Sequence, residues 1–173
     1  LPIDRIAGAS MGSVVGGVIA QSVPAAYRVR VLEAQTENLL DYTIPVVSLL
    51  KGERITKTLD DQFGGWRVED VWIPFTCVST NLTTASKVVH REGPLQTAIR
   101  ASVAIPGVLP PVPMGDDLLI DGGVLDNLPV GLVSDDPSVS TVIASDVSPS
   151  AGPGAESDYG LSVSGWTALR SRV

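Results

Sequence analysis

The sequence predicts a three-layer α/β domain with a mainly parallel central sheet. Apolar, β-branched stretches alternate with helix-like stretches along most of the chain, which is the order that parallel strands joined by helices produce. Two of the apolar stretches also run straight into glycine-flanked polar residues, at residues 8–12 and 121–123, as strands do where they carry side chains to a sheet edge. The 173 residues suffice for a sizeable core, so residues 1–173 are taken as a single domain.

Helices are expected where apolar residues recur every three or four positions, or where small apolar residues follow a turn. Pro24 ends the first helix, Gly64-Gly65 ends the third, and Pro94 suits the first position of the fourth. In chain order these segments are residues 11–21, 28–40, 51–63, 95–103 and the chain from about residue 162. The polar segment 51–63 belongs to the region 41–65, for which a helical pair is favoured over an insertion that covers or shapes a site.

Strands are expected in the short apolar, β-branched segments between these helices. They comprise residues 2–7, 73–79, 86–91, 118–120 and 139–146. The segment 105–113 holds four prolines, which exclude a helix or a central strand and predict a stiff, ordered loop.

The chain is organised around Gly8-Ala9-Ser10-Met11-Gly12, a Gly-x-Ser-x-Gly pattern between a strand and a helix. Such a turn, a nucleophile elbow, exposes a serine hydroxyl above the sheet edge. Gly8 and Gly12 are expected because a Cβ at either position would collide with the neighbouring strand or helix. The N–H of Met11 and the positive end of the helix suit a developing oxyanion. Ser10 is therefore the candidate nucleophile.

Two other interpretations of this stretch are a flexible Gly/Ser loop and a membrane helix. Apolar residues such as Val14 and Val18 disfavour the loop. The uncharged residues 6–26 are long enough to span a bilayer of about 30 Å, and Gly12 and Gly16 form a Gly-x-x-x-Gly pair. Three serines, a glutamine and a proline within them favour a helix packed closely on a sheet instead.

A serine hydroxyl needs a neighbouring base, and the sequence offers two candidates. His90 lies within a predicted strand and precedes the strong acid candidates, so an ordinary strand histidine is the favoured interpretation. Asp121 follows a buried strand, and Gly122 and Gly123 let the backbone turn there without blocking access. Partial burial of Asp121 would raise its pKa and strengthen it as a base; the competing interpretation is a turn aspartate.

The composition excludes several classes of partner. Residues 1–100 carry ten basic and ten acidic side chains, whereas residues 101–173 carry two and nine, within a net charge of −7. An acidic region without basic runs argues against nucleic acid and against purely electrostatic docking to anionic lipid. Cys77 is the only cysteine and His90 the only histidine in the sequence, so no internal disulfide, metal or cofactor is expected.

Motifs spread over nearly the whole chain point to one family. Besides Gly8-x-Ser10-x-Gly12 and Asp121-Gly122-Gly123, they are Asp70-Val71-Trp72-Ile73-Pro74, Arg100-Ala101-Ser102 with Pro106-Gly107, Leu109-Pro110-Pro111, Asn127-Leu128-Pro129 and Tyr159-Gly160 with Ser164-Gly165-Trp166. These segments resemble the patatin-like phospholipases, and most closely their neuropathy target esterase branch. The resemblance implies a Ser10–Asp121 dyad without histidine. It also implies hydrolysis of lysophospholipids or related carboxylic esters through an acyl-enzyme.

The resemblance also points to a part of the domain that this sequence lacks. The family carries a glycine-rich oxyanion loop ahead of the elbow, and no residue precedes Leu1 here, so a catalytic domain cut at both ends is expected. The N–H of Met11 then remains as an oxyanion donor, and losing one such donor costs about 10²–10³ in rate. We expect an active esterase as the parent protein and weak or absent activity in isolated residues 1–173.

Two alternative functions stay open at this point: a catalytically silent binding or regulatory domain of the same fold, and a lipid acyltransferase. A lipid ester is the expected substrate, and it implies contact with a membrane surface through the parent protein. The expected location is the cytoplasm, or a membrane reached peripherally or integrally through flanking segments, because the chain shows no signal peptide.

Overall fold

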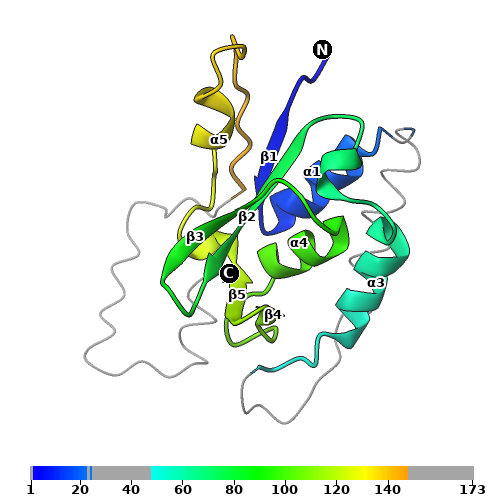
Figure 1. The fold of residues 1–173 in the computed structure, drawn as a ribbon, viewed down its shortest axis with the longest axis vertical. Helices are drawn as coiled ribbons and strands as arrows, with labels where there is room; N and C mark the ends of the chain where they lie inside the picture. The colour runs from blue at the N-terminus through cyan, green and yellow to red at the C-terminus, as the bar shows by residue number, and fades with distance from the viewer. Residues whose placement is uncertain (1, 23, 25–47, 148–173) are drawn as a thin grey trace, which may run out of the picture.

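A computed structural model describes residues 2–22, 24 and 48–147, in which a five-stranded mixed sheet is packed against helices (Figure 1). The strands are β1 (Ile6–Ala9), β2 (Phe75–Asn81), β3 (Ser86–His90), β4 (Val112–Met114) and β5 (Asp117–Asp121). The helices are α1 (Met11–Ala20), α3 (Glu53–Phe63), α4 (Leu95–Ser102) and α5 (Gly131–Ser134), with 3-10 turns η1 (Val68–Asp70) and η2 (Gly122–Val124).

Strand β2 lies at the centre of the sheet and organises the other strands. Residues 75–78 of β2 pair with β1, the last pair being Val78 with Ala9. Residues 79–81 pair with β5, beginning with Ser79 opposite Asp121. Residues 77–81 also pair with β3. Because residues 77–78 pair with both β1 and β3, and residues 79–81 with both β3 and β5, β1 and β5 share one edge of β2 and meet there end to end. The end of β1 and the end of β5 are therefore neighbours.

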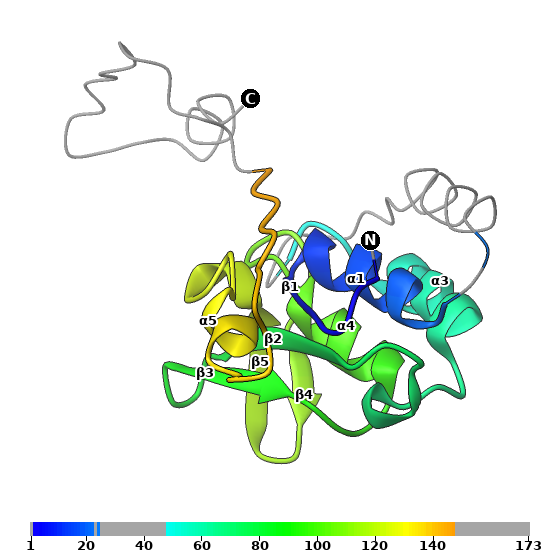
Figure 2. The same ribbon diagram turned by 90° about the horizontal axis from the view of Figure 1, so that it is seen from above.

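Helix α1 packs closely against this sheet because its inner face consists of small residues. A Cβ on Gly16 would lie 2.9 Å from the side chains of Ile6 and Phe75, and one on Gly17 would lie 2.7 Å from Ile99. The core consists mainly of buried side chains from α1, α3, α4 and β2, among them the fully buried Phe63. Figure 2 shows α1, α4 and α3 on one side of the sheet and the short α5 on the other. The close packing predicted from the small residues is confirmed.

The α/β fold is confirmed, and most of the predicted elements are present. Helices are found close to the predicted 11–21, 51–63 and 95–103, and strands close to the predicted 73–79, 86–91 and 118–120. The strand predicted at 2–7 lies at Ile6–Ala9 instead, because residues 2–5 are exposed and only the residues next to the elbow pair with β2. The expectation of a mainly parallel sheet is met only in part. Of the four strand pairings in the described residues, β1–β2 is parallel and the other three are antiparallel.

Two further differences concern single segments. The predicted strand at 139–146 has no regular structure: its side chain Ile143 is 80% exposed, and within the described residues no strand pairs with it. A strand is stabilised by packing of its side chains against neighbours, whereas residues 140–146 are exposed. The proline-rich loop ends in the edge strand β4, where Pro113 pairs with Leu118 and needs no N–H on the outer side. The helices predicted at 28–40 and from residue 162 lie outside the described residues.

A membrane-spanning helix is not found in the part of the chain that the structure describes. Helix α1, which contains the Gly12 and Gly16 pair, has ten residues and follows a sharp turn. A bilayer needs a helix of about twenty residues.

Candidate active site

Ser10 occupies the turn between β1 and α1, where the Gly-x-Ser-x-Gly pattern predicts it. Its backbone has φ 49° and ψ −126°, so φ lies in the left-handed range that residues other than glycine rarely adopt. Such a conformation costs on the order of 1–3 kcal/mol and persists only where the surroundings hold it in place. The strained turn leaves Ser10 half-buried at the end of β1, with its hydroxyl group beside β5.

The two glycines of the elbow are not equivalent. A Cβ on Gly8 would overlap the backbone carbonyl of Gly12, which cannot move without unwinding the first turn of α1. A Cβ on Gly12 would meet no atom of the described residues within 4 Å. The predicted steric need for glycine is therefore right for Gly8 and wrong for Gly12, because the first turn of α1 faces open space at that position.

Asp121 is the last residue of β5, and its carboxylate is hydrogen-bonded on both oxygens. Oδ2 accepts a 2.6 Å hydrogen bond from the Ser10 hydroxyl, and Oδ1 accepts a 2.7 Å bond from the N–H of Gly123. The N–H of Asp121 donates to the carbonyl of Ala104 at 2.9 Å. The backbone and the carboxylate of Asp121 are thus both fixed, with one oxygen directed at Ser10.

Burial raises the pKa of Asp121 above its ordinary value, because the charged carboxylate loses water. The hydrogen bonds from Ser10 and Gly123 act in the opposite direction, since they stabilise the charged form, but the effect of burial is larger. A carboxylate with a raised pKa holds a proton more readily. Asp121 is therefore a stronger base toward a neighbouring hydroxyl than an aspartate in water.

Gly122 and Gly123 give the carboxylate its space. A Cβ on Gly122 would overlap the backbone carbonyl of Val78 in β2. A Cβ on Gly123 would lie 3.0 Å from the Oδ1 atom of Asp121 and 2.8 Å from the Oδ1 atom of Asn127. Glycine at both positions lets η2 lie against β2 while the carboxylate of Asp121 keeps its hydrogen bond from the N–H of Gly123.

His90 lies in β3 opposite Cys77, on the edge of β2 away from β1 and β5. Its Nε2 atom is hydrogen-bonded to the hydroxyl of Ser79 at 2.8 Å. Burial lowers the pKa of His90, which favours the neutral ring. Within the described residues no hydrogen bond joins His90 to Ser10 or Asp121, in agreement with its interpretation as an ordinary strand histidine.

Two buried hydroxyl groups beside Ser10 were not anticipated from the sequence. The N–H of Ser10 donates a 3.0 Å hydrogen bond to Oγ of Ser102, and the carbonyl of Ser10 accepts a 2.6 Å bond from Oγ of Ser13. Both side chains are fully buried. The signal in the sequence was the Arg100-Ala101-Ser102 segment, which marks a family likeness but does not indicate that Ser102 touches the elbow.

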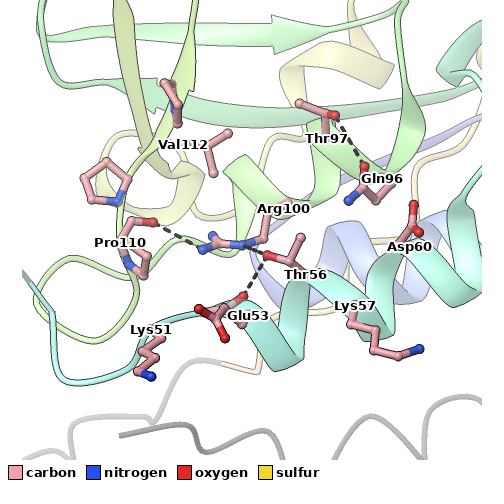
Figure 3. A pocket seen from close by; sticks show the side chains of 13 residues that line it. Lys51, Glu53, Thr56, Lys57, Asp60, Gln96, Thr97, Arg100, Pro110 and Val112 are labelled. Atoms are coloured by element: carbon pink, nitrogen blue, oxygen red, sulfur yellow. Dashed lines mark hydrogen bonds between the residues drawn. The ribbon is translucent and has the colours of Figure 1, made fainter. Parts of the chain in front are cut away.

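A cavity of about 820 Å³ lies apart from Ser10 and Asp121, between α3, α4 and the proline-rich segment (Figure 3). Arg100 extends into its wall from α4, and its guanidinium donates to the hydroxyl of Thr56 at 3.1 Å and to the carbonyl of Pro110 at 3.3 Å. These bonds tie the proline-rich segment to α3 and α4. Arg100 thereby holds in place the chain that leads to β4 and β5.

The described residues contain no group of histidine, cysteine, aspartate or glutamate side chains that could hold a metal ion. The chemistry that the site offers comes from a hydroxyl, a carboxylate and the backbone. The N–H of Met11 begins α1, where the first N–H groups of a helix have no carbonyl partner within it. It follows Ser10 directly in the chain and, at the positive end of the helix, suits a negatively charged oxygen.

An α/β sheet that carries a serine on a strained strand-to-helix turn is the architecture of hydrolytic domains. Comparison with known proteins identifies the family within this class of domains. Residues 1–133 match the family model for patatin-like phospholipase, and the chain belongs to that family.

Individual relatives agree with this assignment. The chain is 37% identical to lysophospholipase NTE1 of Eremothecium gossypii, over 99% of this chain and 12% of that protein. It is 34% identical to patatin-like phospholipase domain-containing protein 6 of Homo sapiens, over 100% of this chain and 13% of that protein. An NTE family protein of Mycobacterium tuberculosis is 36% identical over 78% of this chain and 24% of its own length. The chain thus spans about a quarter or less of these relatives.

Proposed function

We propose that this chain carries the nucleophile and the base of an esterase that hydrolyses lysophospholipids or related lipid esters. The observation that supports it most directly is the 2.6 Å hydrogen bond from the Ser10 hydroxyl to Asp121, on an elbow with the strained backbone of a nucleophile. The membership of the patatin-like phospholipase family and the similarity to a fungal lysophospholipase favour the same chemistry.

In the proposed mechanism, Oγ of Ser10 attacks the carbonyl carbon of the ester while its proton passes to Oδ2 of Asp121. The carbonyl oxygen becomes an oxyanion. The N–H of Met11 donates a hydrogen bond to it, and the positive end of α1 stabilises its charge. The carbon–oxygen bond to the alcohol then breaks, and the proton on Asp121 passes to the departing alkoxide. An acyl group remains on Ser10. Water, deprotonated by Asp121, then attacks the acyl carbon. The bond from that carbon to Oγ of Ser10 breaks, the proton on Asp121 passes to Oγ, and the free acid leaves.

Apolar side chains beside Ser10 and Asp121 favour a substrate with an acyl chain. Met11 follows the nucleophile, and Val124 and Leu125 follow Gly123; all three side chains are more than half exposed. Ile105 is also exposed and follows Ala104, which is bonded to Asp121. Exposed apolar groups beside a polar site fit a ligand with a polar head and a hydrocarbon tail. Such a substrate is presented at a lipid surface, where we place the working enzyme.

The test is release of fatty acid from lysophosphatidylcholine by the complete polypeptide that contains this chain. We expect turnover by the wild type, and loss of at least about 10³-fold in Ser10→Ala and in Asp121→Asn while both variants stay folded. A folded wild type that releases no fatty acid, or a Ser10→Ala variant that keeps its rate, would overturn the proposal. An added short-chain alcohol distinguishes the acyltransferase alternative, because transfer then yields a new ester instead of the free acid.

A further inference from the structure

One short segment at the end of α4 is bonded to both members of the Ser10–Asp121 pair. Oγ of Ser102, the last residue of α4, accepts a 3.0 Å hydrogen bond from the N–H of Ser10. Two residues later, the carbonyl of Ala104 accepts a 2.9 Å bond from the N–H of Asp121. Ser102 and Ala104 are fully buried, so water does not compete for these bonds. This segment thus links the elbow to the end of β5, in addition to the pairing of both strands with β2 and to the hydroxyl–carboxylate bond.

The bond from Ser102 acts on the most strained residue of the elbow. The N–H of Ser10 lies outside the ladder of α1, and the positive φ of Ser10 fixes where that N–H points. A buried N–H without an acceptor costs about 1–3 kcal/mol, so a different orientation of this peptide is disfavoured as long as Ser102 offers its oxygen. The hydrogen bond to Ser102 therefore stabilises the strained backbone conformation of Ser10 relative to conformations with a negative φ.

The other side of the Ser10 peptide is held by α1 itself. The carbonyl of Ser10 accepts a 2.6 Å bond from Oγ of Ser13 and a 2.9 Å bond from its N–H. These two bonds come from the same helix turn and move with it. Among the hydrogen bonds of the Ser10 peptide group within the described residues, the one to Ser102 reaches a different element, the end of α4, and the chain that follows α4 is bonded to Asp121.

We infer that Ser102 is a positioning residue, which sets the distance between the Ser10 hydroxyl and the Asp121 carboxylate by holding the Ser10 N–H against the segment that holds Asp121. This inference rests on the proposed function, since it concerns the efficiency of the same reaction. Ser102 touches neither substrate nor the transferred proton. Its loss changes the alignment of the reacting groups and leaves the substrate-binding surface intact.

The experiment compares two variants with the wild type. Ser102→Ala removes the acceptor, and Ser102→Cys keeps the shape of the side chain, with a slightly larger atom that is a weak acceptor. Each protein is tested for kcat and KM on lysophosphatidylcholine and for the rate at which a fluorophosphonate probe labels Ser10. Misalignment on the order of 1 Å costs up to about 10²-fold in rate. We expect kcat and the labelling rate to fall about 10- to 100-fold in Ser102→Ala, less in Ser102→Cys, with KM changed by less than about 3-fold.

Ser48→Ala is the matched control. Ser48 is also buried, and its hydroxyl donates a 2.7 Å bond to the carbonyl of Leu50, away from Ser10 and Asp121. We expect it to lose thermal stability like Ser102→Ala while keeping kcat. Ser102→Ala with wild-type kcat and labelling rate would overturn the inference, as would an equal loss in Ser48→Ala. If Ser102→Ala does not fold, Ser102→Cys decides by the same measurements. A wild type that is not labelled at Ser10 instead contradicts the proposed function.

Discussion

The hydroxyl of Ser10 lies 2.6 Å from the carboxylate of Asp121 because the strands that precede them end against consecutive residues of β2. Ala9 pairs with Val78, and Asp121 pairs with Ser79. The pairing with β2 thus brings the two groups together, and no loop has to close over them. A hydroxyl and a carboxylate held in this way are already aligned before substrate binds, which lowers the activation free energy of the reaction.

The raised pKa of Asp121 predicts the pH dependence of turnover. Asp121 accepts a proton only when it is ionised, so kcat/KM should fall as pH falls through its pKa. Since burial raises that pKa, the loss should begin at a higher pH than for an aspartate with the ordinary value of 3.8. A profile of kcat/KM from about pH 4 to 8 measures this. Activity that stays constant down to the ordinary range of aspartate would contradict it.

Replacement of His90 tests whether an imidazole takes part. His90→Gln removes the titrating ring but keeps an amide that can bond to Ser79. We expect kcat/KM within about 3-fold of the wild type, the same pH profile, and a loss of stability of about 1 kcal/mol from the altered buried hydrogen bond. Thermal melting and kinetics on the same preparation separate the two effects. A loss of activity of about 10²-fold without unfolding would show that the base has been assigned to the wrong residue.

The same pKa shift predicts how stability depends on pH. Because the pKa of Asp121 is higher in the folded than in the unfolded state, its contribution to the free energy of unfolding is fully present below the unfolded pKa and is lost as pH rises through the folded pKa. Asp121→Asn has no such loss. We therefore expect the melting temperature of Asp121→Asn, relative to the wild type, to increase between about pH 4 and 7. A relative melting temperature that decreases over this range would contradict the predicted sign.

The two elbow glycines should respond differently to alanine. Gly8→Ala places a methyl group against the Gly12 carbonyl and should unfold or severely destabilise the domain. Gly12→Ala meets no described atom within 4 Å and replaces a poor helix former, so its stability should be unchanged or higher by up to about 1 kcal/mol. Chemical denaturation of both variants provides the comparison. Equal destabilisation of the two would show that the elbow is packed differently.

Local patterns in the sequence were sufficient to predict the elbow and the candidate base. Ser10 and Asp121 each stand between an apolar strand and a glycine-bearing turn, and those features depend on neighbouring residues only. The proximity of the two groups depends on the register of β1 and β5 along β2, which joins residues 111 positions apart in the sequence. No local pattern contains that register. The sequence therefore offered Asp121 as one of two candidate bases, and the family likeness favoured its pairing with Ser10.

The same limit explains what the sequence failed to predict. The roles of Ser13 and Ser102 follow from which atoms they face, and a serine near the end of an amphipathic helix has no distinctive sequence signal. Apolar strands alternating with helices favoured parallel pairings. In the structure, β2–β3 and β4–β5 are antiparallel because a short turn joins each pair, and β5 also runs opposite to β2. The segment 139–146 has the composition of a strand but lies without a pairing partner among the described residues.

The most direct measurement is the site of covalent labelling by a fluorophosphonate probe, mapped by peptide mass spectrometry in the complete polypeptide. We predict that the label is attached to Ser10 in the wild type, absent in Ser10→Ala, at least about 10²-fold slower in Asp121→Asn, and retained in His90→Gln. Label attached to a different residue in the folded wild type, or slow labelling in His90→Gln with normal labelling in Asp121→Asn, would contradict a serine activated by Asp121.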